Sequence, residues 1–524
     1  MVKLDVILPI GYTSSDVADA VCAQLPLERS EIRETLIVKR SLCIGADKIE
    51  YKATVAISAS PERETGLLKM RKRVSEYIHP TLEIPDAHLC ARPVVVGAGP
   101  AGLFCALILA ECGARPIVYE RGMDVDSRQR RVDTFKRLGI LDTECNVQYG
   151  EGGAGTYSDG KLKVGAMDKY KMKVLSTFVQ FGADEEILYS VGAHVGTDML
   201  SGIVKKIRER IITLGGEVHF CTRLVKINIH DGKITGGEVE REGKREEFET
   251  DTLVMATGHS ARDSFELLYD VGAPLERRGF GIGLRIEHPR EYIDKLVYGN
   301  NDTTGLGAAS YHLVTHLAGG RSVYSFCMCP GGVVVPAASE ECGIVTNGMS
   351  EHARDGENSN AALLVSVTPE DFGSDSVFAG LDLQRSIEKR AFTLAGGDYK
   401  APASSLSGFM NGERAQMGDV KPSYAVGTVA HSPCEYLPSF ITDSLKAGIC
   451  DFDKWMHGFA LSGAALTGPE TRSTSPIRVT RDDRTKQTLG IKGLYCAGEG
   501  AGYSGGIVSS ARDGIIIAEA IIKG

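Results

Sequence analysis

The stretch PVVVGAGPAGLFCALILAECGARPIVYERG, residues 93–122, decides the fold. A short apolar run enters a glycine-rich turn, continues as an apolar segment of helical length and returns as a second short run that ends at Glu120. This order is typical of a strand, a helix and a second strand parallel to the first. The sequence therefore predicts that an α/β domain begins here.

The turn in this stretch has the spacing G-x-G-x-x-G, at Gly97, Gly99 and Gly102. The first glycine permits a tight turn, the second lets a pyrophosphate approach the backbone, and the third allows close packing of helix and strand. The helix that begins near Pro100 would direct free N–H groups at the phosphates. Glu120 lies 23 residues after Gly97, where an acid is expected to accept hydrogen bonds from an adenosine ribose. Since an acid repels a 2′-phosphate, FAD or NAD is predicted rather than NADP.

Residues 493–507, GLYCAGEGAGYSGGI, favour FAD over NAD. They resemble the C-terminal strand, glycine turn and helix of the glutathione-reductase type of FAD-binding fold, and LVMATG at 253–258 resembles its central motif. The resemblance implies that Glu499 replaces an aspartate on a ribityl hydroxyl, with one methylene more. It also implies that the first N–H groups of the last helix stabilise negative charge on the reduced flavin.

A closer resemblance covers most of the chain. It is to the bacterial group of uncharacterised FAD-dependent dehydrogenases, also called NAD(FAD)-utilising dehydrogenases, and it implies FAD without naming a substrate. The motifs that carry it are GEGGAGTYSDGK at 150–161, ATGHSARD at 256–263, FCMCPGG at 326–332, ETRSTSP at 470–476 and GEGAGYSGGI at 498–507.

The residues predicted to bind FAD come from these motifs and from the segment around Glu120. The loop 150–161 is expected to run along the flavin ring, where Lys161 would favour the anionic reduced form; a purely structural loop is the alternative. The full set is Gly97, Gly99, Pro100, Ala101, Gly102, Glu120, Arg121, Arg128, Gly152, Gly153, Ala154, Gly155, Ser158, Lys161, Thr257, Gly258, Gly498, Glu499, Gly505, Gly506 and Ile507.

Candidates for a catalytic role are fewer, and the sequence assigns none of them firmly: Lys161, His312, His316 and Arg472. The two histidines are candidate proton donors, and a metal site is not predicted because the residues between them favour a strand and no H-E-x-x-H motif is present. Arg472 is a candidate clamp for a substrate carboxylate or an anionic flavin. Ion pairing of Arg472 with Glu470 or another core acid is the alternative.

Cys327 and Cys329 lie two residues apart, so in a regular strand their side chains share one face. A redox-active pair beside the flavin is one interpretation. We favour a buried structural pair, because the geometry of a strand does not suit a disulfide between residues as close in sequence as these two.

The chain has 524 residues, which suggests several domains. We predict a small α+β domain at 1–90, an FAD-binding Rossmann-like domain at 91–270 and 465–524, and an inserted, mainly β substrate or cap domain at 271–464. The first unit is interpreted as a structural or oligomerising appendage, and its basic run at 69–73 as a solvated face.

Composition limits the class of protein. The net charge of −9 disfavours nucleic acid as a partner. Thirteen scattered cysteines without a C-x-x-C pair indicate reduced thiols and a cytoplasmic protein. No signal peptide and no membrane span are predicted. The 61 glycines, with 43% apolar residues, are typical of a globular chain that holds a large cofactor.

Together these features predict an FAD-dependent oxidoreductase that moves hydride or electrons between flavin and an organic small molecule. NAD(P)H is a candidate transient reductant. A flavin-dependent monooxygenase is the alternative enzyme, an FAD-dependent RNA-modifying protein a more distant one, and a non-catalytic flavin-bound interaction protein another class.

Overall fold

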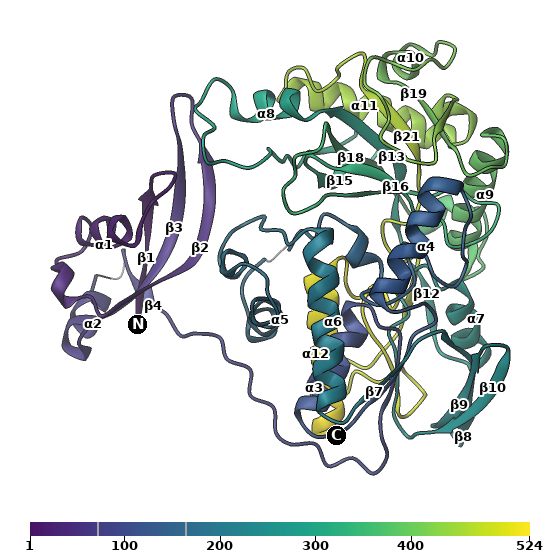
Figure 1. Cartoon of the computed structure of the whole chain (residues 1–524), viewed down its shortest axis with the longest axis horizontal. Helices are drawn as coiled ribbons and strands as arrows, with labels where there is room; N and C mark the ends of the chain where they lie inside the picture. Colours follow the sequence, from purple (N-terminus) through teal and green to yellow (C-terminus); the bar gives the residue numbers. More distant parts are fainter. Residues whose placement is uncertain (71–72, 163–164) are drawn as a thin grey trace.

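A computed structural model describes residues 1–70, 73–162 and 165–524. The basic run at 69–73 therefore lies partly outside the described residues. Figure 1 shows three parts: a small N-terminal unit, a domain with a central parallel sheet, and a second, larger sheet covered by helices.

The central sheet is parallel and has the strand order β23-β11-β5-β6-β7. Helix α3 lies beneath it, and its residues 101–110 are all buried, because α6 and α12 cover the side of α3 that the sheet does not. Figure 1 shows α3, α6 and α12 side by side. The elements are β5 (Val94–Val96), α3 (Pro100–Glu111), β6 (Ile117–Tyr119), α4 (Val125–Leu138), α5 (Lys169–Gln180), α6 (Thr197–Thr213), β7 (Glu217–His219), β11 (Leu253–Met255), α7 (Arg262–Asp270), β23 (Leu494–Cys496) and α12 (Ile507–Lys523).

An antiparallel three-stranded sheet, β10-β9-β8, is inserted between β7 and β11. Its apolar residues join those of β5, β11 and β23 in one core, so it covers the other face of the central sheet. Its strands are β8 (Thr222–His230), β9 (Lys233–Arg241) and β10 (Lys244–Glu249).

The second domain is built on a seven-stranded sheet of order β14-β15-β18-β13-β21-β19-β20. Strands β13 and β18 lie at its centre and are buried almost throughout, because helices cover the apolar side of the sheet. Its strands are β13 (Phe280–Pro289), β14 (Val314–His316), β15 (Ser322–Cys329), β18 (Asn358–Val367), β19 (Ala401–Ser405), β20 (Thr428–Ala430) and β21 (Ala465–Glu470). Beside them lie α8 (Arg290–Tyr298), α9 (Ala379–Leu394), α10 (Leu406–Asn411), α11 (Ser439–Trp455), the ribbon β16 (Val333–Pro336) with β17 (Thr346–Met349), and the ribbon β12 (Leu275–Arg277) with β22 (Ile477–Val479).

The N-terminal unit has a sheet of order β2-β3-β1-β4 and its own apolar core. An extended segment joins it to the central domain, and the tip of its β2–β3 hairpin reaches the second domain (Figure 1), where Ile49 is part of that domain's apolar core. Arg40 attaches it to the central domain, since its N–H donates to the carbonyl of Tyr189 at 2.8 Å and its guanidinium pairs with Glu186. The elements are β1 (Val2–Leu8), α1 (Ser14–Cys22), β2 (Glu34–Ile44), β3 (Ile49–Ser58), α2 (Pro61–Leu68) and β4 (Ser75–Glu76).

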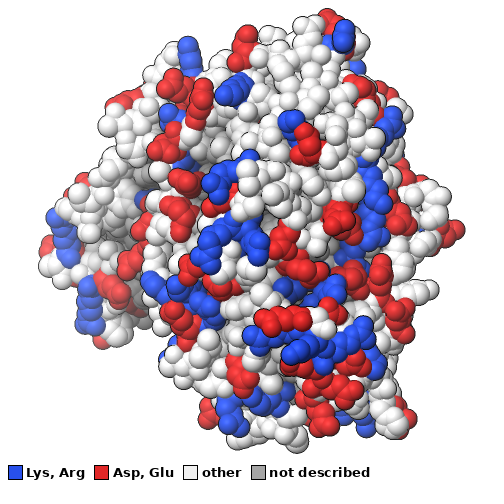
Figure 2. Space-filling view, turned by 45° about the vertical axis from the view of Figure 1, so that its right-hand side comes forward, with Lys and Arg blue, Asp and Glu red and all other residues white. Residues whose placement is uncertain are grey.

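The predicted fold class is confirmed: a Rossmann-like α/β domain carries an inserted, mainly β domain and follows a small α+β unit. On the face seen in Figure 2, basic and acidic side chains are interspersed over the surface. Within the described ranges, no helix is both long enough and apolar enough to cross a membrane.

Candidate functional site

The glycine turn after β5 is held against its neighbours so closely that side chains would not fit. A Cβ at Gly97, where φ is +103°, would lie 2.4 Å from the carbonyl oxygen of Ala256. A Cβ at Gly102 would lie 1.9 Å from the carbonyl oxygen of Gly97. These contacts agree with the roles predicted for the first and third glycines, a tight turn and close packing of helix on strand.

Helix α3 begins at this turn, and helix α12 begins beside it. In neither helix does a side chain cap the first N–H groups. Gly99 is the N-cap of α3, and Gly506, with φ of +121°, is the N-cap of α12. A Cβ at Gly505 or Gly506 would meet no heavy atom within 4 Å. Helix N-termini with open space before them bind anionic groups. The pair therefore fits FAD, with the pyrophosphate at α3 and a flavin carbonyl at α12.

Glu120 follows β6 and is buried. Its carboxylate accepts hydrogen bonds from the backbone N–H groups of Ala98 at 2.7 Å and of Gly122 and Gly150 at 2.9 Å. The side chain therefore ties the glycine turn to the loop that begins at Gly150. It also lines the cavity described below, so a ribose hydroxyl can reach a lone pair that the backbone leaves free.

Replacing Glu120 with glutamine is expected to weaken FAD binding about tenfold, because an amide NH₂ group would face backbone N–H groups that need an acceptor. Equilibrium dialysis or flavin fluorescence measures the dissociation constant. Glu217→Gln, at an exposed carboxyl on the neighbouring strand β7, is the control. Equal FAD affinity in the Glu120 variant and the parent would show that another group holds the ribose.

Arg128 does not lie where the sequence places it. It is among the residues predicted to bind FAD, but it is fully buried and lies outside the cavity wall. Its guanidinium donates to four backbone carbonyls, and it thereby shapes the loop that leads to Gly150. The acceptors are Asn146 at 3.0 Å, Val147 at 3.0 Å, Gly150 at 3.3 Å and Glu151 at 2.7 Å.

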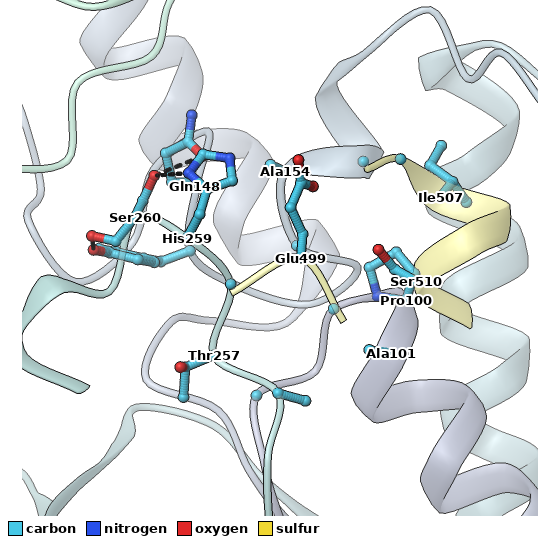
Figure 3. A pocket seen from close by; sticks show the side chains of 18 of the residues that line it. Pro100, Ala101, Gln148, Ala154, Thr257, His259, Ser260, Glu499, Ile507 and Ser510 are labelled. Carbon is cyan, nitrogen blue, oxygen red and sulfur yellow. Dashed lines mark hydrogen bonds between the residues drawn. The ribbon is translucent and has the colours of Figure 1, made fainter. Parts of the chain in front are cut away.

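One cavity joins most of the predicted cofactor residues. Gly102, Arg128, Gly152 and Gly498 lie outside its wall, and the other predicted cofactor residues line it, Arg121, Ser158 and Lys161 among them. Figure 3 shows Pro100, Ala101, Ile507 and Ser510 on one side of this cavity, with Glu499 between them and a group formed by Gln148, His259 and Ser260. Further lining residues that the sequence did not predict as cofactor ligands are Gln148, Thr222, Arg223, Leu224, His259, Ser260, Phe326, Cys327, Asn347, Glu470 and Ser473.

His259 is kept neutral at this wall. Burial, together with the charges of Arg472 and Arg262, lowers the pKa of its imidazole to about 4. Ser260 contacts His259 Nδ1 at 3.3 Å and donates to Gln148 Oε1 at 3.1 Å (Figure 3). The motif ATGHS predicts that this histidine follows β11 closely, but it does not predict what the side chain does.

Glu499 reaches into the cavity from the turn before α12 (Figure 3). Burial raises the pKa of its carboxyl to about 8, against a smaller opposite effect of Arg278. At neutral pH the group therefore carries a proton and can donate a hydrogen bond from that proton to a ligand.

The pKa of Glu499 makes the stability of the FAD-free chain depend on pH. The carboxyl ionises near pH 4.5 when unfolded and near pH 8 when folded, so its contribution to the free energy of unfolding falls as pH rises between these values. Glu499→Gln is expected to remove on the order of 3 kcal/mol of this fall. Urea denaturation across that range checks it, with the exposed Glu291→Gln as control. Parallel pH profiles of parent and Glu499 variant would contradict the assignment.

At the end of the cavity next to the second domain, Glu470 and Arg472 line the wall, and each belongs to a buried ion pair. Arg472 forms a fork with Glu388, with distances of 3.0 and 2.9 Å, and donates to Ser339. It therefore pairs with another core acid and not with Glu470, the partner considered from the sequence. Glu470 pairs instead with the fully buried Arg285.

The other catalytic candidates are divided between the cavity and the surface. Lys161 lines the cavity and donates from Nζ to the carbonyl of Met328 at 2.7 Å; burial lowers its pKa. His312 and His316 are exposed side chains outside the cavity wall, on or beside the strand β14. The expectation that they donate protons in a substrate site is not supported by this placement. Among the residues that the structure describes, no cluster of histidine, cysteine and acidic side chains could hold a metal ion.

Comparison with known proteins agrees with this geometry. A family described as pyridine nucleotide-disulphide oxidoreductase matches residues 91–270, and one described as FAD-dependent protein, C-terminal domain-like, matches residues 279–473. The chain belongs to the FAD-dependent oxidoreductases. Within that class it is similar to an uncharacterized protein from Clostridium beijerinckii, with 46% identity over 511 residues, 96% of this chain and 95% of that one.

Solved structures are similar only remotely. A flavin-dependent brominase is 11% identical and covers 83% of this chain and 79% of its own, with a TM-score of 0.37. The quinol fumarate reductase of E. coli is 14% identical and covers 84% of this chain and 69% of its own, also with a TM-score of 0.37. Likenesses of this size carry no information about the reaction.

Proposed function

We propose that this protein transfers a hydride or electrons between FAD and an organic small molecule that meets the flavin at the second domain. FAD supplies the two-electron chemistry, and NAD(P)H is the proposed reductant, which binds transiently. The observation that carries the proposal is that the predicted cofactor residues and the second domain line the same cavity. Its wall contains the uncapped starts of α3 and α12 and also side chains of the seven-stranded sheet, Phe326, Cys327 and Glu470 among them.

The side chains at this meeting point have complementary tasks. Arg472 in the wall is paired with Glu388, and Arg285 is paired with the wall residue Glu470, so neither arginine offers an unpaired positive charge to an anionic substrate. Glu499 holds a proton near neutral pH and is the proposed donor or acceptor of a proton on the substrate side. The small molecule is therefore expected to be uncharged or weakly polar at the end that meets the flavin.

The motifs shared with the NAD(FAD)-utilising dehydrogenases support placing the chain in that subgroup. We also propose a cytoplasmic location, which rests on the scattered thiols. We propose further that copies of this chain assemble through the N-terminal unit.

The visible spectrum of the purified protein, followed by anaerobic mixing with NADH or NADPH, tests the proposed function. Flavin absorbance that is bleached by one of the two nucleotides and restored by an organic acceptor is the expected result. Absence of flavin after reconstitution with FAD would overturn the proposal. An oxygenated flavin species formed on admission of oxygen would favour the monooxygenase instead.

A further inference from the structure

Two cysteines of the second domain lie at the cavity, at the end of β15. Cys327 is part of the cavity wall, and Cys329 is buried behind it. Neither cysteine is among the residues predicted to bind FAD. Both are close to charged side chains of the cavity, so they differ from the thiols elsewhere in the core.

The strand is irregular where the cysteines lie. The pairing of β15 with β18 shifts register between Phe326 and Cys329, and Cys327 has a φ of +39°. A residue with positive φ interrupts the extended path, so the two side chains are no longer held apart as they are in a regular strand. The Sγ of Cys329 lies 3.2 Å from the carbonyl oxygen of Cys327. The geometric argument against a disulfide, which assumed a regular strand, therefore does not apply.

Two cations, each paired with an acid, contact the backbone of this turn. Arg285 Nη1 donates to the carbonyl of Cys327 at 2.8 Å, and Lys161 Nζ donates to the carbonyl of Met328 at 2.7 Å. Both cations are held by acids, Glu470 for Arg285 and Asp159 for Lys161, the latter at 4.0 Å. Cations next to a thiol favour its thiolate form.

The two thiols differ in acidity. A hydrogen bond from Cys329, with help from Arg285, lowers the pKa of Cys327 although burial opposes it. Burial and the neighbouring Cys327 raise the pKa of Cys329. One member of the pair is thus favoured as a thiolate that faces the cavity, and the other retains its proton.

We propose that Cys327 and Cys329 form a redox-active dithiol that exchanges two electrons with the flavin. This inference rests on the proposed function and adds a second two-electron centre to it. In the oxidising direction the Cys329 S–H bond breaks and an S–S bond to Cys327 forms. The electron pair of the Cys327 thiolate and the Cys329 proton pass to oxidised FAD, equal to one hydride. The reverse reaction lets reduced FAD regenerate the dithiol.

Thiol mapping of the FAD-loaded protein tests the pair without measuring turnover. The protein is treated with diamide or with dithiothreitol, denatured in iodoacetamide, digested and analysed by mass spectrometry. The peptide with both cysteines is expected to escape alkylation after diamide and to be alkylated twice after dithiothreitol. Double alkylation after both treatments would overturn the proposal.

Anaerobic titration of the diamide-treated protein with dithionite tests the link to the flavin. The parent is expected to take up four electrons per FAD, and Cys327→Ser and Cys329→Ser only two, since each variant retains the flavin alone. Cys434→Ser, at an exposed thiol outside the cavity, is the matched control and is expected to take up four. Uptake of two electrons by the parent would overturn the proposal. Failure to bind FAD would instead contradict the proposed function, and thiol mapping of the FAD-free protein would then report on the pair.

Discussion

Replacing Arg128 with methionine is expected to lower the free energy of unfolding by about 4 kcal/mol or more and to abolish FAD retention. Four backbone carbonyls accept from this fully buried guanidinium, and each would lose its donor in a place that water does not reach. The loop they belong to leads to Gly150, whose N–H binds Glu120. Urea denaturation measures the stability, and gel filtration followed by absorbance measures the retained flavin.

Arg130→Met is the control for this variant, because Arg130 lies on the same helix α4 and is exposed. It is expected to change the free energy of unfolding by no more than about 0.5 kcal/mol. If both variants were equally stable, the loop at 146–151 would have to be held by contacts other than Arg128.

Gly102→Ala is expected to weaken FAD binding about a hundredfold. The added methyl group would lie 1.9 Å from the carbonyl oxygen of Gly97, so α3 has to move away from the turn that its N-terminus completes. A hundredfold loss corresponds to about 2.7 kcal/mol, within the range of overpacking costs. Titration of the FAD-free protein with FAD measures the change.

Gly202→Ala is the matched control, because Gly202 is also a helical glycine of the same domain and a Cβ there meets nothing within 4 Å. FAD affinity is expected to be unchanged, and stability to rise slightly, since alanine favours a helix by up to about 1 kcal/mol over glycine. Equal FAD affinity in both variants would show that α3 tolerates a shift.

The elements that depend on local pattern were predictable from the sequence. The turn at Gly97 and the helix after it were predicted from their spacing, and the return of residues 493–507 was predicted from its resemblance to a known fold. The glycine at position 102 could be assigned its packing role because that role depends on neighbours close in sequence.

Roles that depend on distant partners were not predictable. A basic residue on a helix such as α4 has the same pattern whether it faces solvent or, like Arg128, the carbonyls of a loop. The partner of Arg472 is Glu388 on α9, and nothing in the spacing distinguishes it from Glu470. The turn at Cys327 was not predictable for a similar reason. It depends on the register of β15 against β18, which are distant in sequence.

The order in which the binding residues are synthesised has a consequence for how the protein acquires its flavin. Strand β23 and helix α12 are synthesised after the other FAD-binding elements, yet β23 pairs with β11 and α12 packs against α3. A nascent chain that ends before them has an open edge at β11, an uncovered apolar side of α3, and neither Glu499 nor the start of α12. Flavin capture during translation therefore has to wait for these elements, and a product truncated before β23 is expected to be colourless and prone to aggregate.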